Sequence, residues 1–317
     1  MCACSNSSVR VPRKSQDPRA PNVPLHSNMS SLQENPATPF VPDLDAYFAR
    51  IGIQAPKAPT LDGLNRIIEA HVRNIPFENL DILLGKSICV RPAAIERKLV
   101  HGGRGGYCFE QNELLLQVLC ALGYEVTPIS ARVRFQKPRS FVPARTHLFL
   151  RVEIDGQSWL ADVGVGGLSP TCALRLELDI PQATPHETRR IVAAGQWSGF
   201  EQRSPDALLY HQVLLGETWE DVCEFTLESM HSIDRELGNW FTSAHPDSHF
   251  GNRLTVARST ETGRVTLLNR EFKLRSGDGN VQSRTLDTDE ELLEVLSEHF
   301  GLQFPAGTRF EGAELHS

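Results

Sequence analysis

Apolar residues recur every three or four positions in four stretches of the chain, which is the spacing of a helix with one buried face. The first two stretches, 43–52 and 60–76, begin with residues that commonly cap helices, Asp43 and Thr60, and end at a glycine or a proline. We therefore expect a helical N-terminal region.

The third helical stretch runs from 108 to about 122, and the fourth covers 288–301. Gly123 follows the third stretch, where glycine often ends a helix. Thr288 and Glu291 have the spacing of a capping box, in which each side chain satisfies a backbone N–H of the other. Both stretches therefore have a defined beginning or end.

Apolar and polar residues alternate instead over 124–135 and 146–163, which is the pattern of β-strands. Asp155 and Gly156 interrupt the second stretch and form the two-residue turn typical of a hairpin. Residues 252–275 again predict paired strands around a turn that contains glycine. The chain thus reads as helices, then a β unit, then a smaller α/β unit.

The composition is that of an ordinary globular protein, with 317 residues of which 40% are hydrophobic and 22% charged. A net charge of -7 disfavours a surface for nucleic acid or anionic lipid. No apolar run approaches the roughly 18 residues that cross a bilayer, and no signal peptide is recognisable. We expect a cytoplasmic protein without nucleic-acid or membrane partners.

The seven cysteines are odd in number, scattered, and free of a CxxC pair. This pattern suits neither a disulfide framework nor a zinc site, so we expect reduced thiols and no metal. The first 41 residues are rich in serine and proline and poor in large apolar side chains. Because such a segment buries too little surface to offset its ordering entropy, residues 1–41 are predicted to be a disordered extension.

Cys108 lies in the first turn of the third predicted helix and follows a segment with four glycines. Unpaired N–H groups and the positive end of the helix dipole favour an anion there, so a thiolate would be stabilised. The glycines allow a sharp turn and the close approach of a ligand. A cysteine at a helix start is most often a small packed hydrophobe, so the catalytic interpretation needs a base.

The predicted hairpin supplies that base. With Asp155 and Gly156 as turn residues, Phe149 lies opposite Asp162, and His147 is then a diagonal neighbour of Asp162. Diagonal pairs are roughly 7 to 8 Å apart and can be bridged by side chains of this length. The pair faces away from the apolar side of the hairpin, and we expect it to face a cleft. Cys108 as nucleophile, His147 as base and Asp162 as the group that orients the histidine form the arrangement of thiol catalysis.

Three separated motifs in this order resemble those of the arylamine N-acetyltransferases. They are "IPFENLD" (75–81), "RGGYCFEQN" (104–112) and "THLFLRVEIDGQSWLADVGVGG" (146–167). The resemblance implies an α+β fold with a papain-like cysteine-enzyme superfold, made of an N-terminal helical bundle, a central β-barrel and a C-terminal α/β lid. The expected domains are a helical domain at 42–124 with the nucleophile, a β-barrel domain at 125–230 with the histidine and aspartate, and a lid at 231–317.

The resemblance also implies acetyl-CoA as acyl donor, with no tightly bound cofactor, and an arylamine, arylhydrazine or N-hydroxyarylamine as acceptor. The acetyl group would pass through a thioester on Cys108 in a ping-pong reaction. Thr146 and Gly166 match positions near the pantetheine and pyrophosphate of CoA, and Gly164 and Gly167 complete a glycine-rich segment that could approach phosphate closely. Such glycines equally suit a plain loop.

One further feature depends on the resemblance. Glu78 and Arg104 match a pair that ties the first helices to the glycine loop. Candidates for the acceptor pocket are Phe109, Phe135 and Val165.

We weigh two alternatives. A thiol hydrolase or a transglutaminase-like enzyme would use the same three residues, with water or a protein amine as acceptor. A catalytically inactive binding module would need one of the three to be missing, and none is. The oligomeric state is open between a monomer and a homodimer.

Overall fold

The computed structural model describes residues 40–194, 208–277 and 279–312. The predicted disordered extension, apart from its last two residues, lies outside this described part. The division of the rest into three domains stays a prediction.

The helices begin and end where their capping residues predict. α1 (Leu44–Ile51) and α2 (Leu61–Asn74) start after Asp43 and Thr60, and each of these side chains accepts a hydrogen bond from the backbone N–H three residues later. α5 (Cys108–Ala121) and α7 (Asp289–Phe300) match the third and fourth predicted helices, and α7 has the predicted capping box. The remaining helical segments are α3 (Leu80–Leu83), α4 (Pro92–Glu96), a π-helical turn (Arg97–His101), α6 (Ser232–Ala244) and 3-10 turns at Gly166–Leu168 and His249–Gly251.

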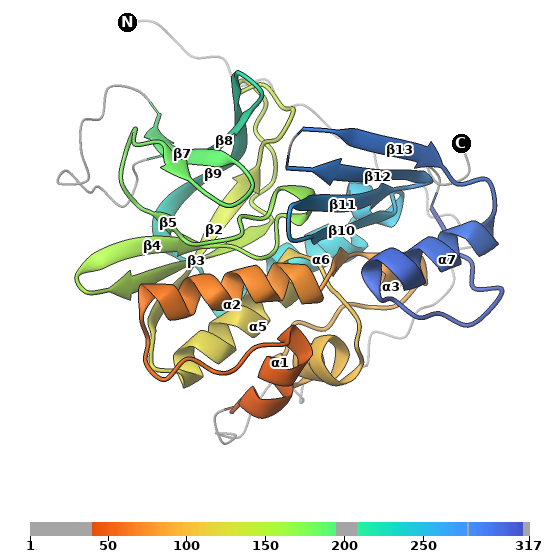
Figure 1. Ribbon diagram of the computed structural model, residues 1–317, viewed down its shortest axis with the longest axis horizontal. Coiled ribbons are helices and arrows are strands. Elements are labelled where there is room, and N and C mark those ends of the chain that lie inside the picture. Colours follow the sequence, from red (N-terminus) through yellow and green to blue (C-terminus); the bar gives the residue numbers. More distant parts are fainter. Residues whose placement is uncertain (1–39, 195–207, 278, 313–317) are drawn as a thin grey trace, which may run out of the picture. The chain divides into compact units, whose positions relative to one another are not determined.

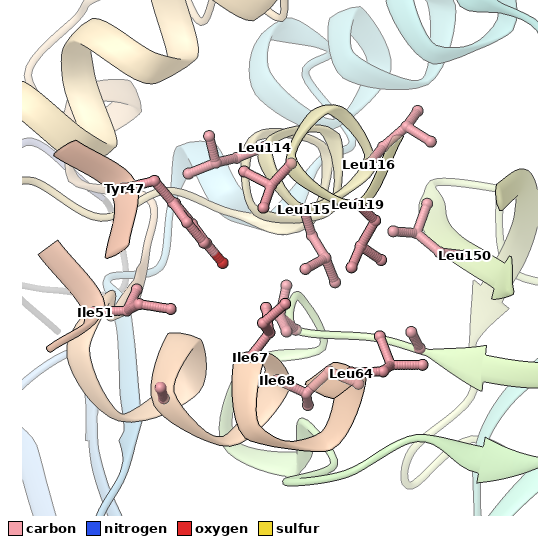
Figure 2. Close-up of a cluster of buried hydrophobic side chains, with 14 of the residues drawn as sticks. Tyr47, Ile51, Leu64, Ile67, Ile68, Leu114, Leu115, Leu116, Leu119 and Leu150 are labelled. Carbon is pink, nitrogen blue, oxygen red and sulfur yellow. The ribbon is translucent and has the colours of Figure 1, made fainter. Parts of the chain in front are cut away.

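α2 and α5 lie along one face of the predicted hairpin, and α1 packs against α2 (Figure 1). The apolar faces of the three helices share one buried cluster with that hairpin, and in it side chains of α5 face those of α2 (Figure 2). Members of the cluster labelled in Figure 2 include Tyr47, Ile51, Leu64, Ile67, Ile68, Leu115, Leu119 and Leu150. This packing fixes the helix that carries Cys108 against the strand that carries His147.

An eight-stranded antiparallel sheet has the order β5-β4-β3-β2-β9-β8-β7-β6. Its strands are β2 (Glu125–Val133), β3 (His147–Ile154), β4 (Gln157–Ala161), β5 (Leu174–Arg175), β6 (Gln182–Ala183), β7 (Thr188–Ala193), β8 (Leu209–Leu215) and β9 (Thr218–Ser229). Leu150 pairs with Ala161, so the predicted register of the β3–β4 hairpin is confirmed. Asp155 and Gly156 both have positive φ, as a tight hairpin turn of this type requires.

The second face of the hairpin, which carries His147 and Asp162 as predicted, is also buried. Phe149 shares their side of the sheet and is 0% exposed in a second cluster, formed by side chains of β2, β8 and β9 among others. The sequence pattern does not indicate that this face is buried, because the face carries polar residues among its apolar ones. His147 and Asp162 are accordingly each 1% exposed.

A second antiparallel sheet has the order β1-β10-β11-β12-β13. Its strands are β1 (Phe77–Glu78), β10 (Thr255–Ser259), β11 (Gly263–Leu268), β12 (Glu271–Ser276) and β13 (Val281–Thr285). The paired strands predicted over 252–275 are therefore present. β1 comes from the N-terminal region and pairs with β10, so segments far apart in sequence meet at the edge of this sheet.

The segment before α5 is tied to β1. Arg104 binds Glu78 at 2.7 Å, which confirms the predicted pair. Gly105 lies so close to β1 that a Cβ there would be 2.0 Å from the carbonyl oxygen of Pro76. At this position the missing side chain makes room for the protein's own backbone.

Candidate active site

Cys108 is the first residue of α5, as predicted, and is buried. The Glu110 carboxylate accepts a hydrogen bond from the backbone N–H of Tyr107 at 3.1 Å, which holds the start of the helix. The Cys108 thiol lies 3.4 Å from the carbonyl oxygen of Thr146, the residue immediately before His147. The helix start thus brings the sulfur to the beginning of β3.

Gly164 allows the segment after β4 to approach this helix start. A Cβ at Gly164 would lie 2.8 Å from Cα of Cys108 and 2.7 Å from Nδ2 of Asn112. Because real Cβ atoms essentially never come this close, any side chain here would push the two segments apart. Gly164 therefore lets the chain just after Asp162 pack directly against the start of α5.

His147 Nε2 and Asp162 Oδ2 are 3.0 Å apart. This contact leaves Nδ1 as the ring nitrogen that Asp162 does not occupy. Burial lowers the pKa of His147, but the Asp162 charge and hydrogen bond, together with Cys108, outweigh it and raise that pKa to about 10. The imidazole is therefore protonated at neutral pH, next to the sulfur.

Asn112 is a site residue that the sequence interpretation missed. It follows Cys108 by four residues, so both lie on the same face of α5. Its side chain donates to Asp162 Oδ1 at 2.8 Å and to the carbonyl of Leu148 at 2.7 Å, and accepts from the N–H of Val163 at 3.0 Å. The helix spacing from Cys108 was the available signal.

A cavity of about 480 Å³ opens beside the thiol. Cys108 and His147 line it, and so do all four residues predicted to contact CoA, Thr146, Gly164, Gly166 and Gly167. Its apolar wall includes Val165, Phe77, Phe141, Phe241 and Phe250. An apolar cavity with a few convergent polar groups is the usual form of a small-molecule site.

The three predicted pocket residues fall in different places. Val165 lines this cavity. Phe109 is not among the lining residues, because the helix turns its ring into the protein, where a Cβ on Gly238 of α6 would meet it at 2.5 Å. Phe135 lines a neighbouring cavity of about 380 Å³, which has Val165 and Gly167 in common with the first.

The described residues include no group of three or more His, Cys, Asp or Glu side chains that could hold a metal ion. Within the same part of the chain, no helix is long and apolar enough to cross a membrane.

Comparisons with known proteins agree with the motifs. A family model described as N-acetyltransferase matches residues 60–308. The arylamine N-acetyltransferase of Mycobacterium tuberculosis is 39% identical over 264 residues, which cover 82% of this chain and 89% of that protein.

Solved structures give the same result. The structure of the M. tuberculosis arylamine N-acetyltransferase has a TM-score of 0.76 at 38% identity, covering 82% of this chain and 93% of that one. The Mycobacterium marinum arylamine N-acetyltransferase in complex with CoA has a TM-score of 0.75 at 34% identity, covering 82% and 92%. These likenesses confirm the predicted α+β, papain-like fold class.

Proposed function

The chain belongs to the arylamine N-acetyltransferase family of acyltransferases, and from this premise we propose that it transfers acetyl from acetyl-CoA through a thioester on Cys108. The acceptor is the amino group of an arylamine or arylhydrazine, or the oxygen of an N-hydroxyarylamine. The CoA complex of the M. marinum enzyme supports the donor. The reaction takes place in the cytoplasm, on a monomer or a homodimer.

The observation that carries the proposal is the position of Cys108 and His147 at one cavity, with Asp162 3.0 Å from the imidazole. A buried, protonated imidazole beside a sulfur favours the thiolate, which is the nucleophilic form of cysteine. Asp162 keeps the ring in the orientation that directs Nδ1 toward the sulfur. The three residues therefore act as nucleophile, proton carrier and orienting group.

In the first half-reaction the Cys108 thiolate attacks the thioester carbonyl of acetyl-CoA. The new carbon–sulfur bond forms as the bond to the CoA sulfur breaks, and the departing CoA thiolate takes the proton from His147. CoA then leaves. In the second half-reaction the amine attacks the acetyl carbonyl, His147 takes the proton that the amine loses, and the Cys108 thiolate is released.

The donor and the acceptor use different parts of the cavity. Thr146, Gly164, Gly166 and Gly167, which line the cavity, lie along the CoA chain. The apolar wall around Val165, Phe77 and Phe250 receives the aromatic ring of the acceptor and holds its amine near the thioester.

Kinetic order tests the proposal against the alternative of a hydrolase. Because acetyl passes to Cys108 before the amine binds, double-reciprocal plots should give parallel lines, and acetyl-CoA alone should release a burst of CoA equal to the enzyme concentration. An aromatic amine should then accelerate turnover well beyond hydrolysis. Intersecting lines would remove the thioester mechanism. Steady hydrolysis that no amine accelerates would make the protein a thiol hydrolase.

A further inference from the structure

The turn Gly166–Leu168 forms part of the cavity wall but has few side chains of its own to hold it. Gly166 has a φ of 71°, and its Cα faces the ring of Phe77. The turn packs against β1, β10 and β11 of the second sheet, while the chain before it belongs to the β3–β4 hairpin. Its position therefore depends on contacts made by its backbone.

Two arginines supply those contacts from opposite sides. Arg189 of β7 donates to the carbonyl oxygen of Leu168 at 2.9 Å. Arg264 of β11 donates to the carbonyl oxygen of Ser169, also at 2.9 Å. Consecutive carbonyls at the end of the turn are thus bound by one residue of each sheet.

Glu187 joins the two arginines. It accepts from Arg189 at 3.0 Å and from two nitrogens of Arg264 at 2.7 and 2.8 Å. Burial would raise the pKa of Glu187, but the two guanidinium groups hold that pKa below its ordinary value. The carboxylate is charged at neutral pH, and its bidentate contact with Arg264 is a strong, directional form of ion pair.

The two arginines are buried, at 0% and 5% exposure for Arg189 and Arg264. Burying two cations with one carboxylate is costly, so stability alone is a weak reason for this arrangement. Such a group does provide fixed geometry. Here it fixes the Gly166–Leu168 turn, which lines the same cavity as Cys108.

We propose that Arg189, Glu187 and Arg264 are positioning residues that hold the Gly166–Leu168 turn in the shape that binds the acyl donor. The inference rests on the proposed function, because it takes CoA as the molecule that this turn receives. Loosening the turn should weaken CoA binding and leave the thiol itself unchanged. The reactivity of Cys108 depends instead on His147 and Asp162. Among the described residues, no hydrogen bond joins Arg189, Glu187 or Arg264 to either of them.

Arg264→Gln is the most informative variant. It removes the bidentate contact and leaves Glu187 and Arg189 as a balanced pair, whereas Glu187→Gln would leave two buried cations without a partner. The measurement uses the full chain and the rate at which iodoacetamide alkylates Cys108 at increasing concentrations of CoA. The CoA concentration that halves this rate reports donor binding without turnover.

For Arg264→Gln we expect the half-protecting CoA concentration to rise about tenfold, the effect of losing one charge-assisted hydrogen bond, with an unchanged alkylation rate in the absence of CoA. Arg264→Lys, which keeps the charge and one donor, should fall between the parent and the glutamine variant. Arg270→Gln is the matched control, since Arg270 lies in the turn after β11 and binds Asp289 of α7 at 2.6 Å, and this variant should bind CoA like the parent.

A half-protecting concentration equal to that of the parent in the folded Arg264 variants would overturn the inference. A fall in the alkylation rate without CoA, by the same factor as the rise in the half-protecting concentration, would also overturn it, because the change would then have disturbed the thiol itself. If the glutamine variant does not fold, the lysine variant decides by the same two readouts. Failure of CoA to protect the parent would instead contradict the proposed function.

Discussion

Asp162 uses both carboxylate oxygens within the site. Oδ2 contacts the His147 ring, while Oδ1 accepts hydrogen bonds from Asn112 and from the backbone N–H of Gly164, both at 2.8 Å. A carboxylate held at both oxygens cannot rotate, so it fixes the plane of the imidazole. It also supplies the negative charge that keeps His147 protonated beside Cys108.

Asp162→Asn should therefore preserve the shape of the site and abolish its function. The amide removes the charge and presents either a donor or an acceptor to the ring, and the equivalent change in a Ser-His-Asp enzyme costs about 10⁴ in rate. We expect a comparable loss in acetyl transfer. Alkylation of Cys108 by iodoacetamide near neutral pH should slow as well. An alkylation rate equal to that of the parent would show that the thiolate does not depend on Asp162.

The position of a residue could be predicted from the sequence where a single local element, such as a turn, determines it. The turn at Asp155 and Gly156 sets the register, and this register brings His147 near Asp162. The direction of Phe109 depends instead on how α6 packs over α5, and the contact of Asn112 with Asp162 depends on how α5 packs on the hairpin. Such tertiary contacts leave no periodic pattern in the sequence.

At the scale of elements, a buried hydrogen-bond chain ties α1, α2 and α5 together. Tyr47 OH contacts His71 Nδ1 at 2.9 Å, and His71 Nε2 contacts Gln111 Oε1 at 2.6 Å. Gln111 in turn donates to the carbonyl of Pro76 at 2.8 Å. Since Gln111 lies in the first turn of α5, these hydrogen bonds support the helix start that presents Cys108.

The protonation state of His71 makes this support depend on pH. Burial lowers the pKa of His71 from 6.5 in the unfolded chain to about 4 in the fold. Between these values the unfolded state binds a proton that the folded state does not, so stability is complete above pH 6.5 and falls as the pH approaches 4. The loss attributable to His71 should be about 3 kcal/mol.

Urea unfolding at a series of pH values checks this expectation. The comparison is with His71→Gln, which cannot titrate but keeps one donor and one acceptor. The free energy of unfolding of the parent should fall more steeply than that of the variant between pH 6.5 and 4. Equal slopes would mean that His71 does not remain neutral in the fold.

Elements with strong local signals could be read from the sequence, and the others could not. The helices with caps and the hairpin with an Asp-Gly turn are predicted within one or two residues of their observed ends. The stretch between 173 and 250 contains strands as short as two residues, β5 and β6, which are too short to show a period.

At the scale of the whole molecule, the cavity draws its wall from α5, the hairpin, α6 and the second sheet. Phe77 of β1 and Thr255 of β10 illustrate this, because they lie far apart in sequence and both line the cavity. The motifs predicted the family and hence the fold, whereas the cavity wall is a product of packing between elements. These parts together support one claim, that Cys108 carries the acetyl group.

Mass spectrometry of the protein after incubation with acetyl-CoA alone tests that claim most directly. One acetyl group should map to the peptide that contains Cys108, disappear on addition of an aromatic amine, and be absent from Cys108→Ser. Cys120 is the matched control, because it lies on the same helix but does not line the cavity, and partial burial together with Glu113 raises the pKa of its thiol. Cys120→Ser should therefore acetylate like the parent. An acetyl group on Cys120, or formation of acetylated amine by Cys108→Ser at the parent's rate, would contradict the account.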